Sequence, residues 1–151
     1  MPTAALLRPA RRFDVPRILR AAASIAAVTL LLGAAQHAKQ EKPVEISFGS
    51  RVKLADYLVP GKTTVFDFYS TYCPTCMALK PAIEQLHASR DDIAVVLVNI
   101  NRPGFKGIDW DSPVSKQFEL PSTPQFKVYD PQGKLQAEGK PAYQLVTGWI
   151  K

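Results

Sequence analysis

The chain has 151 residues, of which 46% are hydrophobic and 21% are charged, so it holds enough apolar sequence for one compact domain and too little for two. The charged fraction is near the globular average, which argues against wholesale disorder. The formal net charge is +6, but no stripe of Lys and Arg interleaved with aromatic residues is present, so nucleic acid is not an expected partner.

Much of the positive charge lies at the N-terminus. The first twenty residues hold five arginines and Asp14, and they therefore carry +4. No charged residue occurs from Ala21 to Ala38, where AAASIAAVTLLLGAA forms an apolar run. A basic stretch followed by ~7–15 apolar residues is typical of a secretory signal. Residues 1–40 are predicted to be an export segment.

Two fates of this segment stay open. The small residues Gly33-Ala34-Ala35 suit a cleavage site, and the high alanine content favours cleavage. The uncharged run also just reaches the ~17–25 residues of a membrane-spanning helix, so an uncleaved anchor over residues 18–38 is the alternative. Positive charge before the run keeps the N-terminus inside. Either fate predicts a periplasmic domain, soluble or anchored to the inner membrane.

The folded domain is predicted over residues 44–151. Clusters of β-branched, aromatic and apolar residues predict strands at 44–48, 63–69, 93–100, 125–130 and 134–138. Helices are expected at 53–58, 73–89, 112–118 and 141–150. This order predicts an α/β fold with a mixed sheet of four to five strands and helices on both faces. The unbroken run IAVVLVNI, residues 93–100, fits a strand covered on both faces.

The helix predicted at 73–89 has an apolar face. The residues expected to share this face are Met77, Leu79, Ile83 and Leu86. His87 is expected at the helix surface.

The chemistry is concentrated in Cys73-Pro74-Thr75-Cys76, which holds the only two cysteines. A purely structural disulfide is one interpretation in an exported domain. A bridge between residues three apart, however, closes a very small loop and stabilises little in the chain-entropy model. Close cysteines suit thiol–disulfide exchange, because one attacks and the other resolves the mixed disulfide. A helix N-terminus stabilises a thiolate, so Cys73 is the predicted attacking group and Cys76 the resolving thiol.

Zinc is the other common use of paired cysteines. A structural zinc site needs four ligands, and this chain offers one Cys-x-x-Cys with two histidines. His37 lies in the export segment, and His87 is about three helical turns from Cys76. No metal is therefore expected, and no nucleotide or flavin motif implies a cofactor.

The domain resembles the thioredoxin family, in particular its exported or membrane-tethered bacterial branch, over about residues 44–151. The matching features are the cysteine pair after a strand, Asp67 six residues before Cys73, Pro81 five residues after Cys76, and Thr123-Pro124 before a strand. The resemblance implies that Asp67 is a buried acid assisting proton transfer at Cys76. It implies a helix kink at Pro81 and a cis peptide bond at Pro124. The substrate-binding residues implied are Tyr72, Pro74, Thr75, Thr123 and Pro124.

The residues taken alone leave other interpretations of these positions open. Asp67 also fits an edge strand where its carboxylate reaches water, Pro81 also fits a helix end, and Pro124 also fits an ordinary trans proline at a strand entry. Trp110, in the long loop, fits either the core or the groove.

The chain also departs from the family pattern. Tyr72 stands where thioredoxins have tryptophan, and Pro-Thr replaces Gly-Pro between the cysteines. Leu97 stands where thioredoxin carries a lysine near the buried acid. These differences bear on the redox potential and the partner.

The resulting prediction is a monomeric thiol–disulfide oxidoreductase. Its expected substrates are thiols or disulfides of exported proteins, and the resemblance to tethered reductases favours the reducing direction. A separate thiol redox partner must restore the starting state. The competing predictions are a non-catalytic binding module with an inert disulfide and a thiol metallochaperone.

Overall fold

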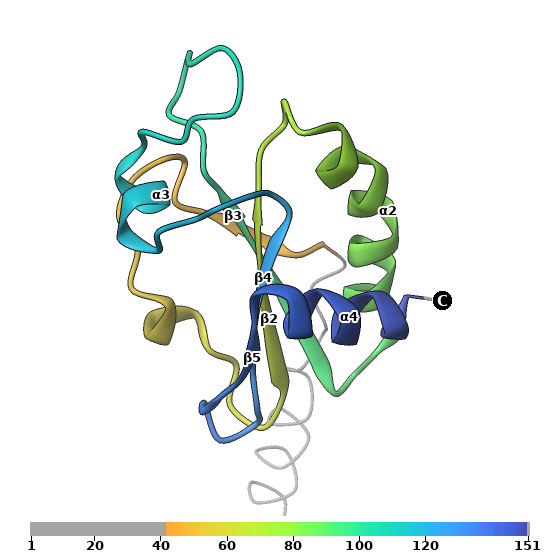
Figure 1. Ribbon diagram of the computed structural model, residues 1–151. Helices are drawn as coiled ribbons and strands as arrows, with labels where there is room; N and C mark the ends of the chain where they lie inside the picture. The colour runs from red at the N-terminus through yellow and green to blue at the C-terminus, as the bar shows by residue number, and fades with distance from the viewer. Residues whose placement is uncertain (1–41, 151) are drawn as a thin grey trace, which may run out of the picture. The chain divides into compact units, whose positions relative to one another are not determined.

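The computed structural model describes residues 42–150 (Figure 1). The predicted export segment at 1–40 and the possible anchor at 18–38 lie outside the described residues. Within residues 42–150, no helix has the length and apolar character needed to cross a membrane.

A five-stranded mixed sheet forms the centre of the domain, with strand order β1-β3-β2-β4-β5. The strands are β1 (Val44–Ile46), β2 (Thr63–Tyr69), β3 (Ile93–Asn99), β4 (Gln125–Tyr129) and β5 (Leu135–Glu138). β1 and β2 pair with β3 in parallel, β4 pairs with β2 antiparallel, and β5 pairs with β4 antiparallel. The predicted mixed α/β sheet is confirmed.

Helices cover both faces of this sheet (Figure 1). The helical elements are the 3-10 helix η2 (Leu54–Tyr57), α2 (Pro74–Ser89), α3 (Pro113–Gln117) and α4 (Gly139–Trp149). One apolar cluster lies under α2 and α4 and includes Ile83, Phe126 and Val146. A second cluster on the opposite face joins Phe66 and Phe68 to Leu54 and Val114, near η2 and α3. All seven residues of β3 are buried, as its unbroken apolar run predicts.

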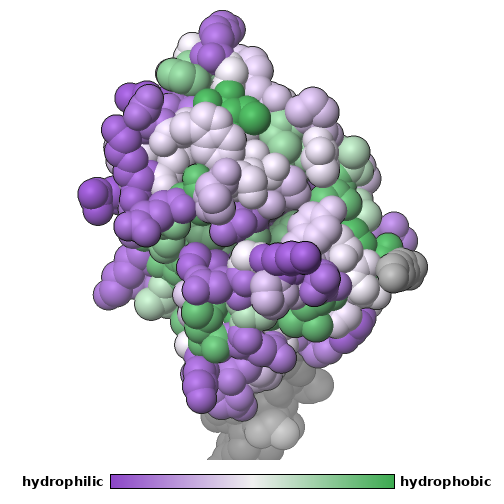
Figure 2. Space-filling view, in the orientation of Figure 1, coloured by the Kyte–Doolittle hydropathy of each residue, from purple (hydrophilic) through white to green (hydrophobic). Residues whose placement is uncertain are grey.

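One face of the domain mixes polar and apolar residues (Figure 2). On the face shown in Figure 2, green apolar residues occur in separate groups among purple and pale ones. Apolar residues scattered in this way are normal for a protein surface.

β1 is shorter than predicted. It ends at Ile46 rather than residue 48, because Ser47 and Phe48 adopt left-handed backbone conformations with φ of 79° and 48°. The chain turns here, and the amide of Phe48 donates to the carbonyl of Ile46. A left-handed residue cannot continue a strand.

α2 begins directly after Cys73 and runs through Pro81 to Ser89, so the interpretation of Pro81 as a helix end is wrong. Ile83 and Leu86 are buried as predicted. The placement of Met77 on the buried face is wrong, because its side chain is 40% exposed. The buried stripe of the helix instead follows the spacing of Cys76, Ile83 and Leu86.

His87 is also not the surface residue that the helical pattern predicts. It is only 8% exposed, and its Nδ1 accepts the backbone N–H of Val95 at 3.0 Å. The edge strand β1 pairs with Val96–Val98 and does not extend as far as Val95. It therefore offers no carbonyl to the amide of Val95. A buried N–H without an acceptor is costly, and the imidazole supplies one.

Candidate active site

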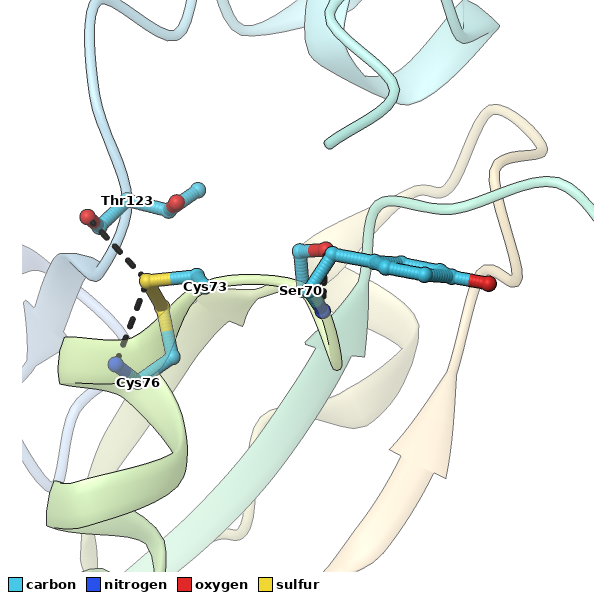
Figure 3. The surroundings of a disulfide bond; sticks show 5 residues. Ser70, Cys73, Cys76 and Thr123 are labelled. Carbon is cyan, nitrogen blue, oxygen red and sulfur yellow. Dashed lines mark hydrogen bonds between the residues drawn. A yellow bond between two sulfur atoms is a disulfide. The ribbon is translucent and has the colours of Figure 1, made fainter. Parts of the chain in front are cut away.

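The cysteine pair lies at one edge of the sheet, in the connection between β2 and α2. Because β1, β2 and β3 are parallel, their carboxyl ends meet at this edge. The turn after β2 is held by Ser70, which is fully buried. The carbonyl of Ser70 accepts the amide of Cys73 at 3.1 Å, and its Oγ accepts the amide of Tyr72 at 3.1 Å (Figure 3).

Cys73 and Cys76 form a disulfide with a Cα–Cα distance of 5.3 Å. Cys73 is the N-cap of α2, and its Sγ accepts the backbone N–H of Cys76 at 3.1 Å (Figure 3). In the reduced protein the same N–H and the helix N-terminus favour a thiolate at Cys73. Cys73 is 4% and Cys76 2% exposed, so the disulfide is largely shielded from solvent.

Thr123 and Pro124 lie against the disulfide although they are far from it in sequence. The carbonyl oxygen of Thr123 is 3.5 Å from Sγ of Cys73, and the Thr123–Pro124 peptide bond is cis (Figure 3). Oγ1 of Thr123 is buried and has no hydrogen-bond partner among the described residues. The Thr123 backbone therefore lies directly beside the reactive sulfur, where the main chain of a docked polypeptide would pass.

The other predicted substrate-binding residues surround this contact. Tyr72, Pro74 and Thr75 are exposed, and Tyr72 is 44% exposed. The structure thus brings together the motif and the Thr123–Pro124 loop. Trp110 is 43% exposed, which excludes the core interpretation.

Asp67 lies on β2, the central strand, so the edge-strand interpretation is wrong. It is 3% exposed, and its register partners on the neighbouring strands are Leu97 and Phe126. Oδ1 of Asp67 has no hydrogen-bond partner among the described residues. Burial raises the pKa of Asp67 to about 7, and the charge of Lys80 lowers it in part. A buried carboxyl that titrates near neutrality can take up and release a proton there.

Sequence reasoning missed two charged residues of this region: Lys80, whose charge acts on Asp67, and Glu45, which contacts Tyr69. Nζ of Lys80 is 4.9 Å from the ring centroid of Tyr69, and the Tyr69 hydroxyl donates to Glu45. Nδ2 of Asn99 also donates to Glu45, at 2.9 Å. Burial, followed by the contact with Glu45, raises the pKa of Tyr69 above its usual range. The available signal was spacing, since Lys80 follows Cys76 by four residues on the same face of α2.

The described residues contain no group of three or more His, Cys, Asp or Glu side chains arranged to hold a metal ion. The two sulfurs and the buried carboxyl of Asp67 are groups of this site that can take part in thiol–disulfide exchange.

Comparison with known proteins shows to which family this chain belongs. The thioredoxin family model matches residues 47–147. A thioredoxin from Trypanosoma brucei brucei has a TM-score of 0.53 at 15% identity, covering 74% of this chain and 91% of that one. A mutant thioredoxin from Halobacterium salinarum has a TM-score of 0.51 at 17% identity, covering 76% and 96%. No curated protein matches by sequence.

At these identities the solved structures support the fold, whereas the family match spans most of the described domain and includes Cys73, Cys76, Asp67 and Pro124. Members of this family act on protein thiols and disulfides together with redox partners. The chain belongs to the thioredoxin family and is a thiol–disulfide oxidoreductase built on the pair Cys73 and Cys76.

Proposed function

We propose that this enzyme reduces disulfide bonds of exported proteins and is returned to its dithiol form by a separate thiol redox partner. The position of Cys73 is the observation that best supports this proposed reaction. Its sulfur is placed between a helix N-terminus and the carbonyl of Thr123, with the buried acid Asp67 on the same face of the sheet.

The first half of the cycle is attack by Cys73. Its thiolate displaces one sulfur of the substrate disulfide, which leaves as a thiolate and takes up a proton from water. A mixed disulfide joins Cys73 to the remaining substrate sulfur. The substrate main chain lies along Thr123 and Pro124, where the Thr123 carbonyl is available next to Sγ.

The second half is resolution by Cys76. The carboxylate of Asp67 accepts the proton of the Cys76 thiol, and the new thiolate attacks Sγ of Cys73. The second substrate sulfur leaves as a thiolate and is protonated, so the substrate gains two electrons and two protons. With a pKa of about 7, Asp67 is close to the midpoint that general-base catalysis at neutral pH favours.

A trapping experiment tests the order of the two cysteines. Purified Cys76→Ser protein incubated with an exported protein that contains disulfides should accumulate a mixed disulfide, visible as a reducible band of higher mass. The matched variant Cys73→Ser should accumulate none, because only Cys73 is the attacking group. Equal trapping by both variants would refute the assigned roles.

The direction is tested by the reduction potential of the cysteine pair, measured against glutathione or dithiothreitol buffers. A potential of about −250 mV or lower supports a reductant. A potential of about −120 mV would instead make the protein an oxidant of exported thiols. A pair that never cycles would replace this function with a binding module.

Export and tethering form the remaining part of the proposal. Residues 1–40 deliver the domain to the periplasm, and the segment is either removed or kept as an anchor at 18–38. Expression of the full chain in a bacterial host, followed by fractionation and determination of the mature N-terminus, distinguishes these fates. Recovery of the intact chain in the cytoplasm would exclude both.

A further inference from the structure

A recess of about 310 Å³ lies beside the cysteine motif and is not used by the proposed cycle. Its lining comes from the segments that follow β1, β2 and β3, at the edge where these parallel strands end. The residues lining it are Phe48, Thr71, Tyr72, Asn99, Asn101 and the loop 102–106. A second hollow lies beside Pro124 and is lined partly by Lys140 and Tyr143. The two hollows have no lining residue in common.

Phe48 is presented to this recess by an unfavourable backbone conformation. Its φ is 48° and its side chain is 48% exposed. The next residue, Gly49, holds the turn after β1 in place. Its amide donates to the backbone carbonyl of Asn99, and its carbonyl accepts the amide of Val114. Left-handed backbone at a bulky residue and an apolar ring in water both cost free energy. Strain of this kind concentrates at functional sites.

Arg102, another lining residue, is held by two contacts within the domain. The guanidinium of Arg102 lies 5.4 Å from the ring centroid of Phe105. It also donates to both carboxylate oxygens of Asp109, at 2.7 and 2.8 Å, and Asp109 is fully buried. Phe105 is nevertheless 38% exposed. A side chain that is already held in place lowers the ordering cost of binding.

The polar features of the recess indicate what it binds. The charged residues in its lining are Arg102 and Lys106, both cations, and no carboxylate lines it. Asp109 compensates the charge of Arg102, and among the described residues no ion pair compensates Lys106, so its charge is open to a ligand. Asn101 is 8% exposed, and its Oδ1 is buried without a hydrogen-bond partner among the described residues. The recess thus offers aromatic rings and a cation to a ligand.

We propose that this recess docks an extended polypeptide segment of the partner protein, close to that protein's reactive cysteine. An aromatic side chain of the segment packs between Phe48 and Phe105. A neighbouring carboxylate of the segment pairs with Lys106. The inference rests on the proposed function, since it names the sequence class that the enzyme selects: acidic and aromatic residues beside the cysteine.

The test separates docking from catalysis. The full chain carrying Cys73→Ser and Cys76→Ser is titrated with two fluorescent peptides, in which serine replaces the cysteine and the neighbours are Phe-Asp or Ser-Lys. The Phe-Asp peptide should bind about tenfold more tightly, the difference that one buried contact supplies. Phe48→Asn keeps a residue that tolerates left-handed backbone, and it should remove this preference. Lys106→Glu should weaken it, because it repels the aspartate while the aromatic contact remains.

Two matched controls and a turnover assay complete the design. Leu135→Ser and Lys134→Glu alter an equally exposed apolar residue and a lysine outside the recess, and both should leave the preference intact. In the protein with both cysteines, Phe48→Asn should slow reduction of a Phe-Asp peptide disulfide and leave glutathione disulfide reduction unchanged.

Failure of docking and failure of the proposed function give different results. Equal binding of both peptides, or a preference that survives Phe48→Asn, would overturn the docking proposal. So would a concentration-dependent dimer that Phe48→Asn abolishes, because the recess would then hold a second copy. A clear peptide preference in a protein that reduces neither disulfide would uphold the docking site and reject the reductase function.

Discussion

The ammonium group of Lys80 lies 4.9 Å from the ring centroid of Tyr69, two residues along β2 from Asp67. The strand neighbour that would supply a cation from within the sheet is Leu97, which is apolar. In this protein the positive charge near the buried acid therefore comes from α2. It reaches the acid from the helix that also carries Cys76.

Removing this charge should raise the pKa of Asp67. Lys80→Met keeps an apolar stem and deletes the charge that lowers this pKa, so the midpoint should move above about 7. Lys80→Arg should retain most of the effect. Tyr69, whose hydroxyl is bonded to Glu45, also interacts electrostatically with Asp67, and the register partners Leu97 and Phe126 are apolar.

The measurement is an NMR titration of the Asp67 carboxyl in the oxidised protein, with Lys134→Met as the control. The midpoint of peptide disulfide reduction against pH should move in the same direction. An Asp67 titration unaltered by Lys80→Met would show that the helix charge does not act on the acid.

Asp67→Asn should stabilise the oxidised protein at alkaline pH. The pKa of Asp67 is near 3.8 in an unfolded chain and about 7 in the native one, so between these values the native state holds a proton that the unfolded state has lost. The free energy of unfolding of the parent therefore falls as pH rises from about 4 to about 7. At pH 8 the variant should exceed the parent by about 2 to 4 kcal/mol.

Urea unfolding at a series of pH values measures this difference. The gap between Asp67→Asn and the parent should open across the window between about pH 4 and 7 and shrink towards zero below it. A gap that is constant with pH would mean that packing, rather than ionisation, separates the two proteins.

His87→Phe should destabilise the domain by about 1 to 3 kcal/mol. The substitution keeps an aromatic side chain but removes the acceptor for the amide of Val95, and a buried unpaired N–H costs about this much. Met77→Ala is the matched change on the same helix, and since Met77 is 40% exposed it should cost little. Thermal or urea unfolding measures both, and equal losses would show that the Val95 contact contributes nothing.

Gly49→Ala should be more damaging than Gly61→Ala, although both glycines have φ near 80°. A Cβ at Gly49 would lie 2.6 Å from Cγ and 2.7 Å from the backbone N of Arg102, whereas nothing lies within 4 Å of one at Gly61. Gly61→Ala should cost only the left-handed strain, about 1 to 2 kcal/mol. Gly49→Ala must also move the Arg102 backbone, so its free energy of unfolding should be lower still. Urea midpoints of the two variants check this, and similar losses would contradict the steric argument.

Local patterns made the fold and the reactive pair predictable. The apolar run 93–100 became the fully buried β3, and the switch to helical spacing after Cys73 became α2. Such patterns are readable because side-chain periodicity is a property of neighbouring residues. The chemistry of the cysteine pair was readable for the same reason, since its spacing and its place before a helix are both local.

Tertiary structure alone decided the environment of these residues. The end of β1, the burial of His87, the charge of Lys80 beside Tyr69 and the recess next to Tyr72 all depend on segments distant in sequence. The Thr123 carbonyl reaches Cys73 across 50 residues, and His87 pairs with an amide that no periodicity links to it. A sequence pattern records which face a side chain occupies within its own element. Packing between elements then determines which groups meet there, and with them the pKa of Asp67 and the surface offered to a partner.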